Sequence, residues 1–264
     1  MNPFTPVPVR EDEELMTTPS KRTAIVTGSS GGIGTAVCRT LRNDGFWVAG
    51  LDVAPSHDGD GPDQHFDVDV TDEASVRDAI GKVVAQRGTI DGLATVAGIT
   101  GPFKRSHEIE VEEFDRLIAV NVKGTWLVAK HVITHMLSEG THGSIVYISS
   151  INGLVGGKAI PMYHATKGAV RLLAKADAVT YGPAGIRVNS VHPGSIQHTP
   201  MTDAAASNSP FSLEEYERRM IEAHPLGRRG EPSEIADAVA FLLSDRSTFI
   251  TGTEVVVDGG YTAR

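Results

Sequence analysis

Strand-like and helix-like segments alternate along most of this chain, and that order constrains the fold more than any other feature of the sequence. The expected strands are short apolar runs at Thr23–Thr27, Trp47–Asp52, Leu93–Ala97, Ser144–Ser149, Arg187–His192 and Glu254–Val257. The expected helices follow the apolar spacing i, i+3, i+4, i+7 and lie at Gly32–Asp44, Asp72–Arg87, Val111–Leu137, Pro161–Thr180 and Ser233–Leu243. This alternation predicts right-handed βαβ units and an α/β fold with a single doubly wound parallel sheet, covered by helices on both faces.

The composition excludes several other classes of protein. With 40% hydrophobic and 22% charged residues, the chain has the balance of a globular protein, and no apolar run reaches the length of a membrane span. Its formal net charge of -9 would repel phosphate backbones and anionic lipids, so neither nucleic acid nor a membrane is an expected partner. Cys38 is the only cysteine, and His131 and His135 lack a third ligand, so no disulfide and no metal site are expected.

The first twenty residues differ from the rest of the chain. They contain four prolines and the acidic run Glu11–Glu14, show no helical or strand period, and are expected to form a flexible N-terminal extension. Residues 21–264 are expected to form one domain, which includes a lid at about residues 196–223. The acidic start lacks the apolar segment of a signal peptide, so a cytoplasmic location is expected.

A glycine-rich turn joins the first expected strand to the first expected helix. Gly28, Gly32 and Gly34 lack a Cβ atom, so the backbone there can turn tightly and come close to a pyrophosphate. Free N–H groups at the helix N-terminus, around Ile33, would then bind the phosphates. A P-loop is excluded because the turn contains no Gly-Lys-Ser/Thr sequence. The turn predicts a Rossmann-type dinucleotide site at the carboxyl ends of the strands.

The acidic residue at the end of the second expected strand bears on the choice of dinucleotide. Asp52 follows Gly34 by 18 residues. A carboxylate at this place accepts hydrogen bonds from both hydroxyls of an adenosine ribose and repels a 2′-phosphate. The nearby Ser29, Ser30 and Val53 carry no positive charge that would compensate the repulsion. The sequence therefore predicts NAD, rather than NADP, as the cofactor.

Tyr163 and Lys167 are four residues apart and share one face of an expected helix. At about 4 Å, the lysine charge would favour the phenolate by roughly 4 kcal/mol at an effective dielectric near 20, or about three pKa units. The pKa of Tyr163 is therefore expected to fall toward neutrality, where a phenol can act as a general base. The expected strand before this helix would bring Ser150 to the same end of the sheet. The alternative is an ordinary solvated pair on a helix surface.

Asn121 lies in the long expected helix, close in angle to Phe114, Leu117 and Ile118. A polar side chain on such an apolar stripe is costly unless it finds buried hydrogen-bond partners. We therefore expect Asn121 to belong to an internal hydrogen-bond network.

Together these motifs resemble the short-chain dehydrogenase/reductase family, from about residue 21 to the C-terminus. The residues that carry the resemblance are Gly28, Gly32, Gly34, Asp69, Val70, Ala97, Gly98, Asn121, Ser150, Tyr163, Lys167, Pro193 and Gly194. Within the family, the segments around Ser150, Lys167 and Asp258 look like those of NAD-dependent alicyclic alcohol dehydrogenases of the cyclopentanol type, and of hydroxysteroid dehydrogenases. The resemblance implies an oxidoreductase that transfers a hydride between NAD(H) and a secondary alcohol or ketone.

The resemblance also implies a role for each matched residue. Tyr163 is the acid/base, and Lys167 lowers its pKa and holds the nicotinamide ribose. Ser150 binds the substrate oxygen, and Asn121 anchors a water that passes protons to solvent. The implied cofactor contacts are Gly28, Gly32, Ile33, Gly34, Asp52, Val53, Asp69, Val70, Ala97, Gly98, Tyr163, Lys167, Pro193, Gly194, Ile196 and Thr199. The implied substrate contacts are Ser150, Asn152, Met162 and Tyr163.

Two segments depart from the family pattern. Thr95 and Val96 stand where the family usually has two asparagines, and Thr95 is expected to replace one of their hydrogen bonds. The family threonine, usually four residues after the glycine that matches Gly194, stands here five residues after it as Thr199, which indicates a one-residue insertion. Because of this insertion, the contact with the nicotinamide carboxamide that the resemblance implies is assigned to Ile196 more firmly than to Thr199.

The residues expected around the substrate are mostly apolar, with no Arg or Lys at the centre that could bind a carboxylate or phosphate. A neutral secondary alcohol or ketone, alicyclic or of steroid size, fits such walls best. Alternatives are a hydroxysteroid dehydrogenase and a 3-oxoacyl-thioester reductase, although no basic docking patch is visible for the latter. A dinucleotide-sensing protein without turnover is an alternative of another class. The complete set of Asn121, Ser150, Tyr163 and Lys167 argues against it.

The two long expected helices bear on assembly. Val111–Leu137 and Pro161–Thr180 are apolar over more of their circumference than one face of a sheet can cover. Together with the oligomeric state that is usual in the family, this predicts a homotetramer built on paired helices, with Tyr261 near the pocket of a neighbouring subunit.

Overall fold

A seven-stranded sheet, parallel throughout, forms the centre of the computed structural model, which describes residues 21–56, 59–157 and 160–263. The strands are β1 (Thr23–Thr27), β2 (Trp47–Asp52), β3 (Gln64–Asp67), β4 (Gly92–Thr95), β5 (Ser144–Ile148), β6 (Arg187–Pro193) and β7 (Glu254–Val257). Their order is β3-β2-β1-β4-β5-β6-β7, so the winding reverses between β1 and β4. The predicted doubly wound α/β fold is confirmed, and the reversal marks where a ligand crevice is expected. The predicted N-terminal extension lies outside the described residues.

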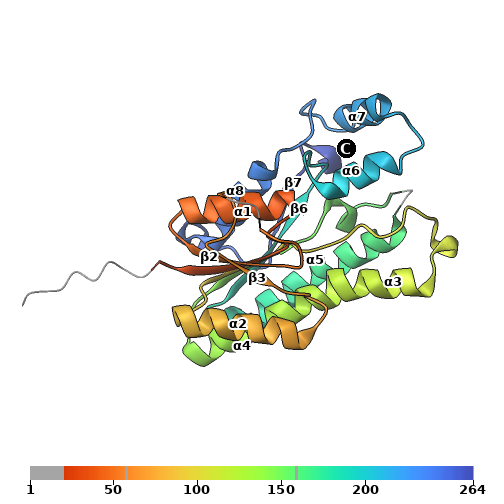
Figure 1. The fold of residues 1–264 in the computed structure, drawn as a ribbon. Helices are drawn as coiled ribbons and strands as arrows, with labels where there is room; N and C mark the ends of the chain where they lie inside the picture. Colours follow the sequence, from red (N-terminus) through yellow and green to blue (C-terminus); the bar gives the residue numbers. More distant parts are fainter. Residues whose placement is uncertain (1–20, 57–58, 158–159, 264) are drawn as a thin grey trace, which may run out of the picture.

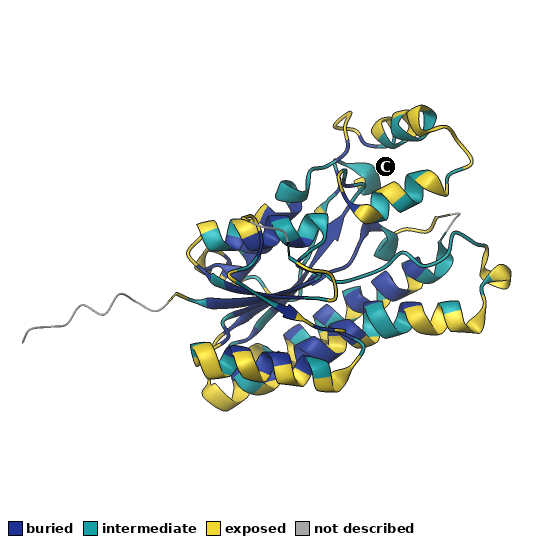
Figure 2. Cartoon of the chain, in the orientation of Figure 1, coloured by how far each residue is buried: buried dark blue, intermediate teal, exposed yellow. Residues whose placement is uncertain are grey.

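Helices cover both faces of the sheet (Figure 1). On one face lie α1 (Gly32–Asn43) and α8 (Pro232–Leu243), and on the other lie α2 (Glu73–Arg87), α4 (Thr125–Glu139) and α5 (Pro161–Tyr181). An apolar core fills the space between the sheet and each layer of helices. The central strands are buried, whereas the helices keep an exposed outer face (Figure 2). Burial on both faces explains why the strands are continuous apolar runs without polar alternation.

The single helix predicted over Val111–Leu137 is wrong, because the structure divides this segment. α3 (Val111–Ile118) passes into a π-helical segment at Ala119–Gly124, from which α4 continues. A Cβ atom on Gly124 would lie 2.7 Å from Val70 Cγ2, so the wide turn packs closely on the chain after β3. Single π-turns inside helices are common at functional sites, and this one carries Asn121.

The edge strand β3 was not predicted. Its sequence is polar apart from Phe66, which is the one residue of the strand that packs into the core. A four-residue edge strand with a single buried side chain shows no alternation that a sequence pattern could reveal. The structure also ends β4 at Thr95, before the predicted Ala97, because the chain leaves the sheet at Val96 to line the cleft described below.

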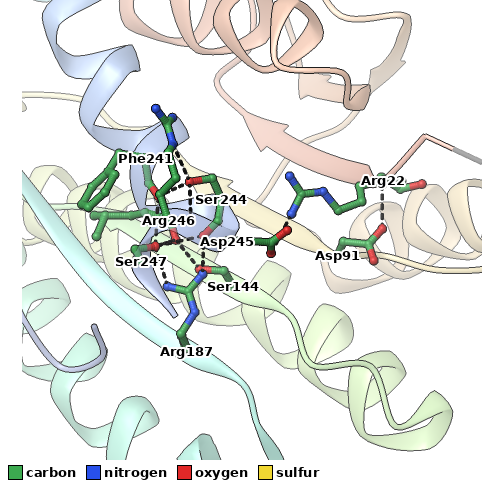
Figure 3. Close-up of polar contacts among 11 residues, drawn as sticks. Arg22, Asp91, Ser144, Arg187, Phe241, Ser244, Asp245, Arg246 and Ser247 are labelled. Atoms are coloured by element: carbon green, nitrogen blue, oxygen red, sulfur yellow. Dashed lines mark hydrogen bonds and ion pairs between the residues drawn. The ribbon is translucent and has the colours of Figure 1, made fainter. Parts of the chain in front are cut away.

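At the amino ends of the strands, a polar network joins the sheet to the end of α8 (Figure 3). Arg187 Nη1 donates to Ser247 Oγ at 3.0 Å, and its Nη2 donates to the Ser244 carbonyl oxygen at 3.1 Å. Ser144 Oγ donates to the Leu242 carbonyl oxygen at 2.7 Å. These bonds satisfy carbonyl groups that a helix leaves unpaired at its C-terminus. They attach the amino ends of these strands to the end of α8, while the glycine-rich turn lies at the carboxyl ends of the strands.

The segment predicted as a lid contains two helices, α6 (Pro200–Ser207) and α7 (Leu213–Glu222). In Figure 1 they lie together beyond the ends of β6 and β7, apart from the helices that cover the sheet. Both begin with a side-chain cap, from Thr199 and Ser212. Within the described part of the chain, no helix combines the length and apolarity needed to cross a membrane.

Candidate active site

The glycine-rich turn borders a cleft of about 600 Å³ at the carboxyl ends of β1, β2 and β4. Gly28 has a positive φ of 64°, and a Cβ atom on Gly34 would lie 1.9 Å from the Gly28 carbonyl oxygen. A Cβ atom on Gly32 would lie 2.5 Å from the His198 carbonyl oxygen. Side chains are therefore excluded from these three positions, and the backbone itself forms the wall. Such a cradle at the start of a helix fits the pyrophosphate of a dinucleotide.

Most of the residues predicted to bind the cofactor line this cleft. They are Gly28, Gly32, Ile33, Gly34, Asp52, Val53, Asp69, Val70, Ala97, Gly98 and Thr199. Lining residues that were not predicted are Gly31, Leu51, Val68, Thr71, Val96, Ile99, Arg116, Ala119, Val120, Pro200 and Met201. Ala119 and Val120 belong to the π-helical segment. A regular apolar period gives no sign of such a turn, so the sequence held no signal for these two.

The two acidic residues of the cleft have backbone partners. Asp52 Oδ2 accepts from the Ser30 N–H at 3.0 Å, and Oδ1 accepts from the Ala54 N–H at 2.9 Å. Each carboxylate oxygen has a second lone pair, so Asp52 can still accept from two ribose hydroxyls. Asp69 Oδ1 accepts from the N–H and the hydroxyl of Thr71, at 2.9 and 2.8 Å. This carboxylate holds the turn that brings Thr71 into the cleft wall.

Ser150, Tyr163 and Lys167 come together at the end of β5. They are 7%, 6% and 3% exposed, so the alternative of a solvated pair on a helix surface is wrong. Ser150 Oγ accepts from the Asn152 N–H at 3.1 Å, and a hydrogen bond with Ser150 lowers the pKa of Tyr163. Lys167 Nζ lies 5.7 Å from the centre of the Tyr163 ring and donates to the Ile148 carbonyl oxygen at 2.8 Å.

This group adjoins the dinucleotide cleft. The Tyr163 hydroxyl donates to the Met201 sulfur at 3.6 Å, and Met201 lines the cleft. A Cβ atom on Gly98, another lining residue, would lie 3.4 Å from Lys167 Nζ. A glycine at that position therefore leaves space beside the ammonium group. Met162 precedes Tyr163 in the first turn of α5 and is half-buried.

The acid–base properties of the pair differ from the prediction. Burial raises the pKa of Tyr163 to about 12 and lowers the pKa of Lys167 to about 8. The predicted fall of the Tyr163 pKa toward neutrality is wrong, because Lys167 loses its charge at a lower pH than that at which the phenol ionises. Between these pH values the pair holds one proton, and moving that proton from Tyr163 to Lys167 would create the phenolate without changing the net charge.

Asn121 belongs to an internal hydrogen-bond network, as predicted. Its Nδ2 donates to the Ile99 carbonyl oxygen at 2.8 Å and to Thr166 Oγ1 at 3.1 Å. Its Oδ1 accepts from the Ile99 N–H at 2.9 Å. Asn121 thus joins the loop after β4 to α5, the helix that carries Tyr163 and Lys167. Its role in holding a water stays a prediction.

The structure resolves both departures from the family pattern. Thr95 Oγ1 is buried and has no hydrogen-bond partner among the described residues, so the expectation that it replaces an asparagine bond is wrong. Instead, Thr27 Oγ1 accepts from the Ala97 N–H at 3.1 Å. The extra residue before Thr199 is accommodated by His198, which has a positive φ of 57°. That conformation lets Thr199 both cap α6 and line the cleft.

The segment predicted to lie beside the nicotinamide borders a second hollow. Pro193 is the last residue of β6, while Gly194 and Ile196 line a neighbouring hollow of about 360 Å³ together with His224. Neither Gly194 nor Ile196 is among the residues that line the main cleft, and their contact with the nicotinamide stays a prediction. Over residues 21–56, 59–157 and 160–263, no group of three or more His, Cys, Asp or Glu could hold a metal.

A glycine cradle that fits a dinucleotide, with a buried Ser-Tyr-Lys group beside it, defines a dinucleotide-dependent oxidoreductase. The family model described as enoyl-(acyl carrier protein) reductase matches residues 28–262. The chain belongs to the short-chain dehydrogenase/reductase family, and it is an enzyme that acts on CH–OH groups. The alternative of a sensor without turnover is wrong.

Relatives and solved structures agree with this assignment over most of the chain. The cis-4-hydroxycyclohexanecarboxylate dehydrogenase of Sinomonas cyclohexanicum is 38% identical, over 92% of this chain and 98% of the relative. The cyclopentanol dehydrogenase of Comamonas sp. (strain NCIMB 9872) is also 38% identical, over 92% and 97%. A crystal structure of NAD+-bound xylitol dehydrogenase is 30% identical, with a TM-score of 0.83 over 90% of this chain and 98% of that one. The structure of ElxO with NADP bound is equally similar, at 30% and 0.83, over 92% and 100%.

Proposed function

We propose that this protein is an NAD-dependent dehydrogenase of neutral secondary alcohols, in particular alicyclic ones. The observation that carries the proposal is the buried group of Ser150, Tyr163 and Lys167, next to a dinucleotide cleft that contains Asp52. Relatives named for ring alcohols support the alicyclic class. When bound, the nicotinamide accepts the hydride from the carbinol carbon. A cytoplasmic location, expected from the sequence, is part of the proposal.

In this proposal the protein's own residues position the substrate and move a proton. Tyr163 takes the hydroxyl proton during oxidation and returns it during reduction. Ser150 donates its single hydroxyl proton to the substrate oxygen, while its Oγ continues to accept from the Asn152 N–H. Lys167 holds the nicotinamide ribose and exchanges a proton with Tyr163, while Asn121 anchors the water that leads to solvent. Contact between the substrate and the side chains of Asn152 and Met162 belongs to the same proposal.

The cofactor would lie along the cleft with each part against a different wall. The backbone of Gly28, Gly32, Ile33 and Gly34 would bind the pyrophosphate. Asp52 and Val53 would face the adenosine ribose, and Asp69 and Val70 the adenine. Ala97 and Gly98 would border the central part, with Thr199 across from Gly32. The nicotinamide would lie near Tyr163 and Lys167, with the segment Pro193–Ile196 on its far side.

The proposal predicts which alcohols are oxidised, and with which cofactor. In a panel of cyclopentanol, cyclohexanol, a hydroxysteroid and a 3-hydroxyacyl thioester, the neutral ring alcohols should give the highest kcat/KM, measured as NADH absorbance. With the best substrate, kcat/KM for NAD should exceed that for NADP at least tenfold, or about 1.4 kcal/mol, because Asp52 repels the 2′-phosphate.

The controls separate substrate class from cofactor choice. Asp52→Asn keeps the shape of the side chain and removes its charge. It should therefore raise kcat/KM with NADP and reduce the ratio of kcat/KM for NAD to kcat/KM for NADP. Equal efficiency of the wild type with both cofactors would contradict the NAD assignment. The highest kcat/KM with the thioester would favour a 3-oxoacyl-thioester reductase, and the highest value with the steroid a hydroxysteroid dehydrogenase.

We also propose that the enzyme is a homotetramer built on α4 and α5. Large apolar side chains are exposed on both helices: Trp126, Leu137, Leu172 and Val179. Val179 is 81% exposed and lies on the same helix face as Leu172, seven residues earlier, so α5 presents an apolar stripe rather than a single exposed side chain. Light scattering at micromolar concentration should give the mass of four chains, and Val179→Asp should give a smaller species. Leu213→Asp, on the exposed side of α7, is the control, and a monomeric wild type would refute the assembly.

A further inference from the structure

Ser195 and Ile196, which follow β6 and Gly194, are held by residues from the far end of the lid. The Ser195 N–H donates to His224 Nε2 at 3.3 Å. The Ser195 carbonyl oxygen accepts from the Gly230 N–H at 3.0 Å, and Ile196 and Gly230 form a parallel bridge. The chain that returns from the lid therefore runs beside the chain that enters it.

Arg229 makes further contacts with this segment. Its side chain is only 6% exposed. Nε donates to Ser195 Oγ at 3.1 Å, Nη2 donates to the Ile196 carbonyl oxygen at 3.1 Å, and Nη1 forms an ion pair with Glu217. A buried guanidinium is costly unless its donors are paired, so the three acceptors and Arg229 fix one another. Because Glu217 belongs to α7, Arg229 ties Ser195 and Ile196 to the lid.

His224 supports the same segment from another direction. Its Nδ1 lies 2.6 Å from the Met220 carbonyl oxygen and therefore carries the ring proton. Nε2 is then the acceptor that the Ser195 N–H requires. The ring is 3% exposed and lies 5.3 Å from the ring of Tyr261. Met220, like Glu217, belongs to α7, so a second contact links this helix to Ser195.

One backbone donor of the segment is left over. The Ser195 N–H, carbonyl and hydroxyl groups and the Ile196 carbonyl all have partners from residues 224–230. The Ile196 N–H, in contrast, has no hydrogen-bond partner within the described residues. A segment whose other backbone groups are held, with a single backbone N–H remaining, is suited to present that N–H to a ligand.

We propose that Glu217, His224 and Arg229 form a latch, which fixes Ser195 and Ile196 in place for the contact between Ile196 and the nicotinamide carboxamide that the family resemblance implies. The latch also couples this contact to the position of α7, so that closure of the lid and alignment of the ring occur together. Arg229 is a positioning residue, because it acts through Ser195 and Ile196. The inference rests on the proposed function, since it takes the nicotinamide as the ligand of this segment.

Arg229→Met tests the latch, because methionine keeps an apolar stem and removes every donor. We expect kcat for alcohol oxidation to fall at least tenfold, and the isotope effect with the carbinol-deuterated alcohol to increase as hydride transfer slows. The inhibition constant of ADP-ribose, which has no nicotinamide ring, should stay within twofold. Arg229→Lys should recover part of the loss. Glu217→Gln, which weakens only the tie to α7, should raise KM for the alcohol more than it lowers kcat.

Arg218→Met is the matched control, since Arg218 lies on α7 and pairs with Glu215 and Glu222 on the exposed surface. It should leave kcat and KM unchanged. The latch is wrong if Arg229→Met keeps more than a third of the wild-type kcat, or if its affinity for ADP-ribose falls by the same factor as kcat. Either result leaves the proposed function standing. If the wild type oxidises no alcohol of the panel, the function fails, and the positioning role with it. If thermal unfolding shows that Arg229→Met is not folded, Arg229→Lys and Glu217→Gln test the latch with the same measurements.

Discussion

Replacing Tyr163 by phenylalanine is expected to lower kcat for alcohol oxidation by at least about a thousandfold. The phenol hydroxyl is the group proposed to take the proton, and it reaches the dinucleotide cleft beside Met201. The ring itself remains, so the packing around it and the cleft should be preserved. NADH binding, measured by fluorescence titration, should therefore stay close to that of the wild type while turnover is lost.

Two further variants show whether the loss is specific to this hydroxyl. Tyr181→Phe makes the same chemical change at the C-terminal end of α5 and should leave kcat unchanged. Ser150→Ala should lower kcat and leave the plateau near pH 8 in place, because Lys167 sets that plateau, whereas the hydrogen bond of Ser150 acts on the Tyr163 pKa of about 12. More than a tenth of wild-type activity in Tyr163→Phe would falsify the mechanism.

Replacing Lys167 by methionine is expected to weaken NAD binding and to change the pH profile. Burial places the pKa of Lys167 at about 8 and that of Tyr163 at about 12. Oxidation by the wild type should rise with pH until the pair has lost one proton, near pH 8, and then level off. Without the amine, the base forms only when Tyr163 itself ionises. When kcat/KM is measured against pH, the residual activity of the variant should therefore continue to rise above the pH at which the wild type levels off.

Lys175→Met is the control for this variant. Lys175 lies two turns further along α5, where it pairs with Glu254 at 2.9 Å, away from the cleft. Its loss should leave both the NAD affinity and the pH profile unchanged. A Lys167→Met profile that levels off at the same pH as the wild type would show that Lys167 takes no part in the proton balance of Tyr163.

The parts of the site that could be predicted depend on neighbouring residues. A strand, a glycine turn and a helix start follow one another between Thr23 and Asn43, and each shows its own local pattern. Tyr163 and Lys167 share a helix face because four residues separate them. Asn121 was predicted to be buried because it interrupts an apolar stripe. The prediction failed where an element lacks a period, as in β3, or keeps the period while changing its geometry, as in the π-helical segment.

Apart from β3 and the division of the long helix, the sequence by itself therefore determined the order of the strands and helices, the glycine cradle, and the residues able to exchange a proton. Only the tertiary structure decided their acid–base behaviour, because the pKa of Tyr163 and of Lys167 depends on burial by segments distant in the chain. It also decided that Thr95 has no partner among the described residues, and that Arg229 reaches Ser195 from 34 residues away. Burial and hydrogen bonding between distant segments arise from packing, which no local spacing of residues encodes.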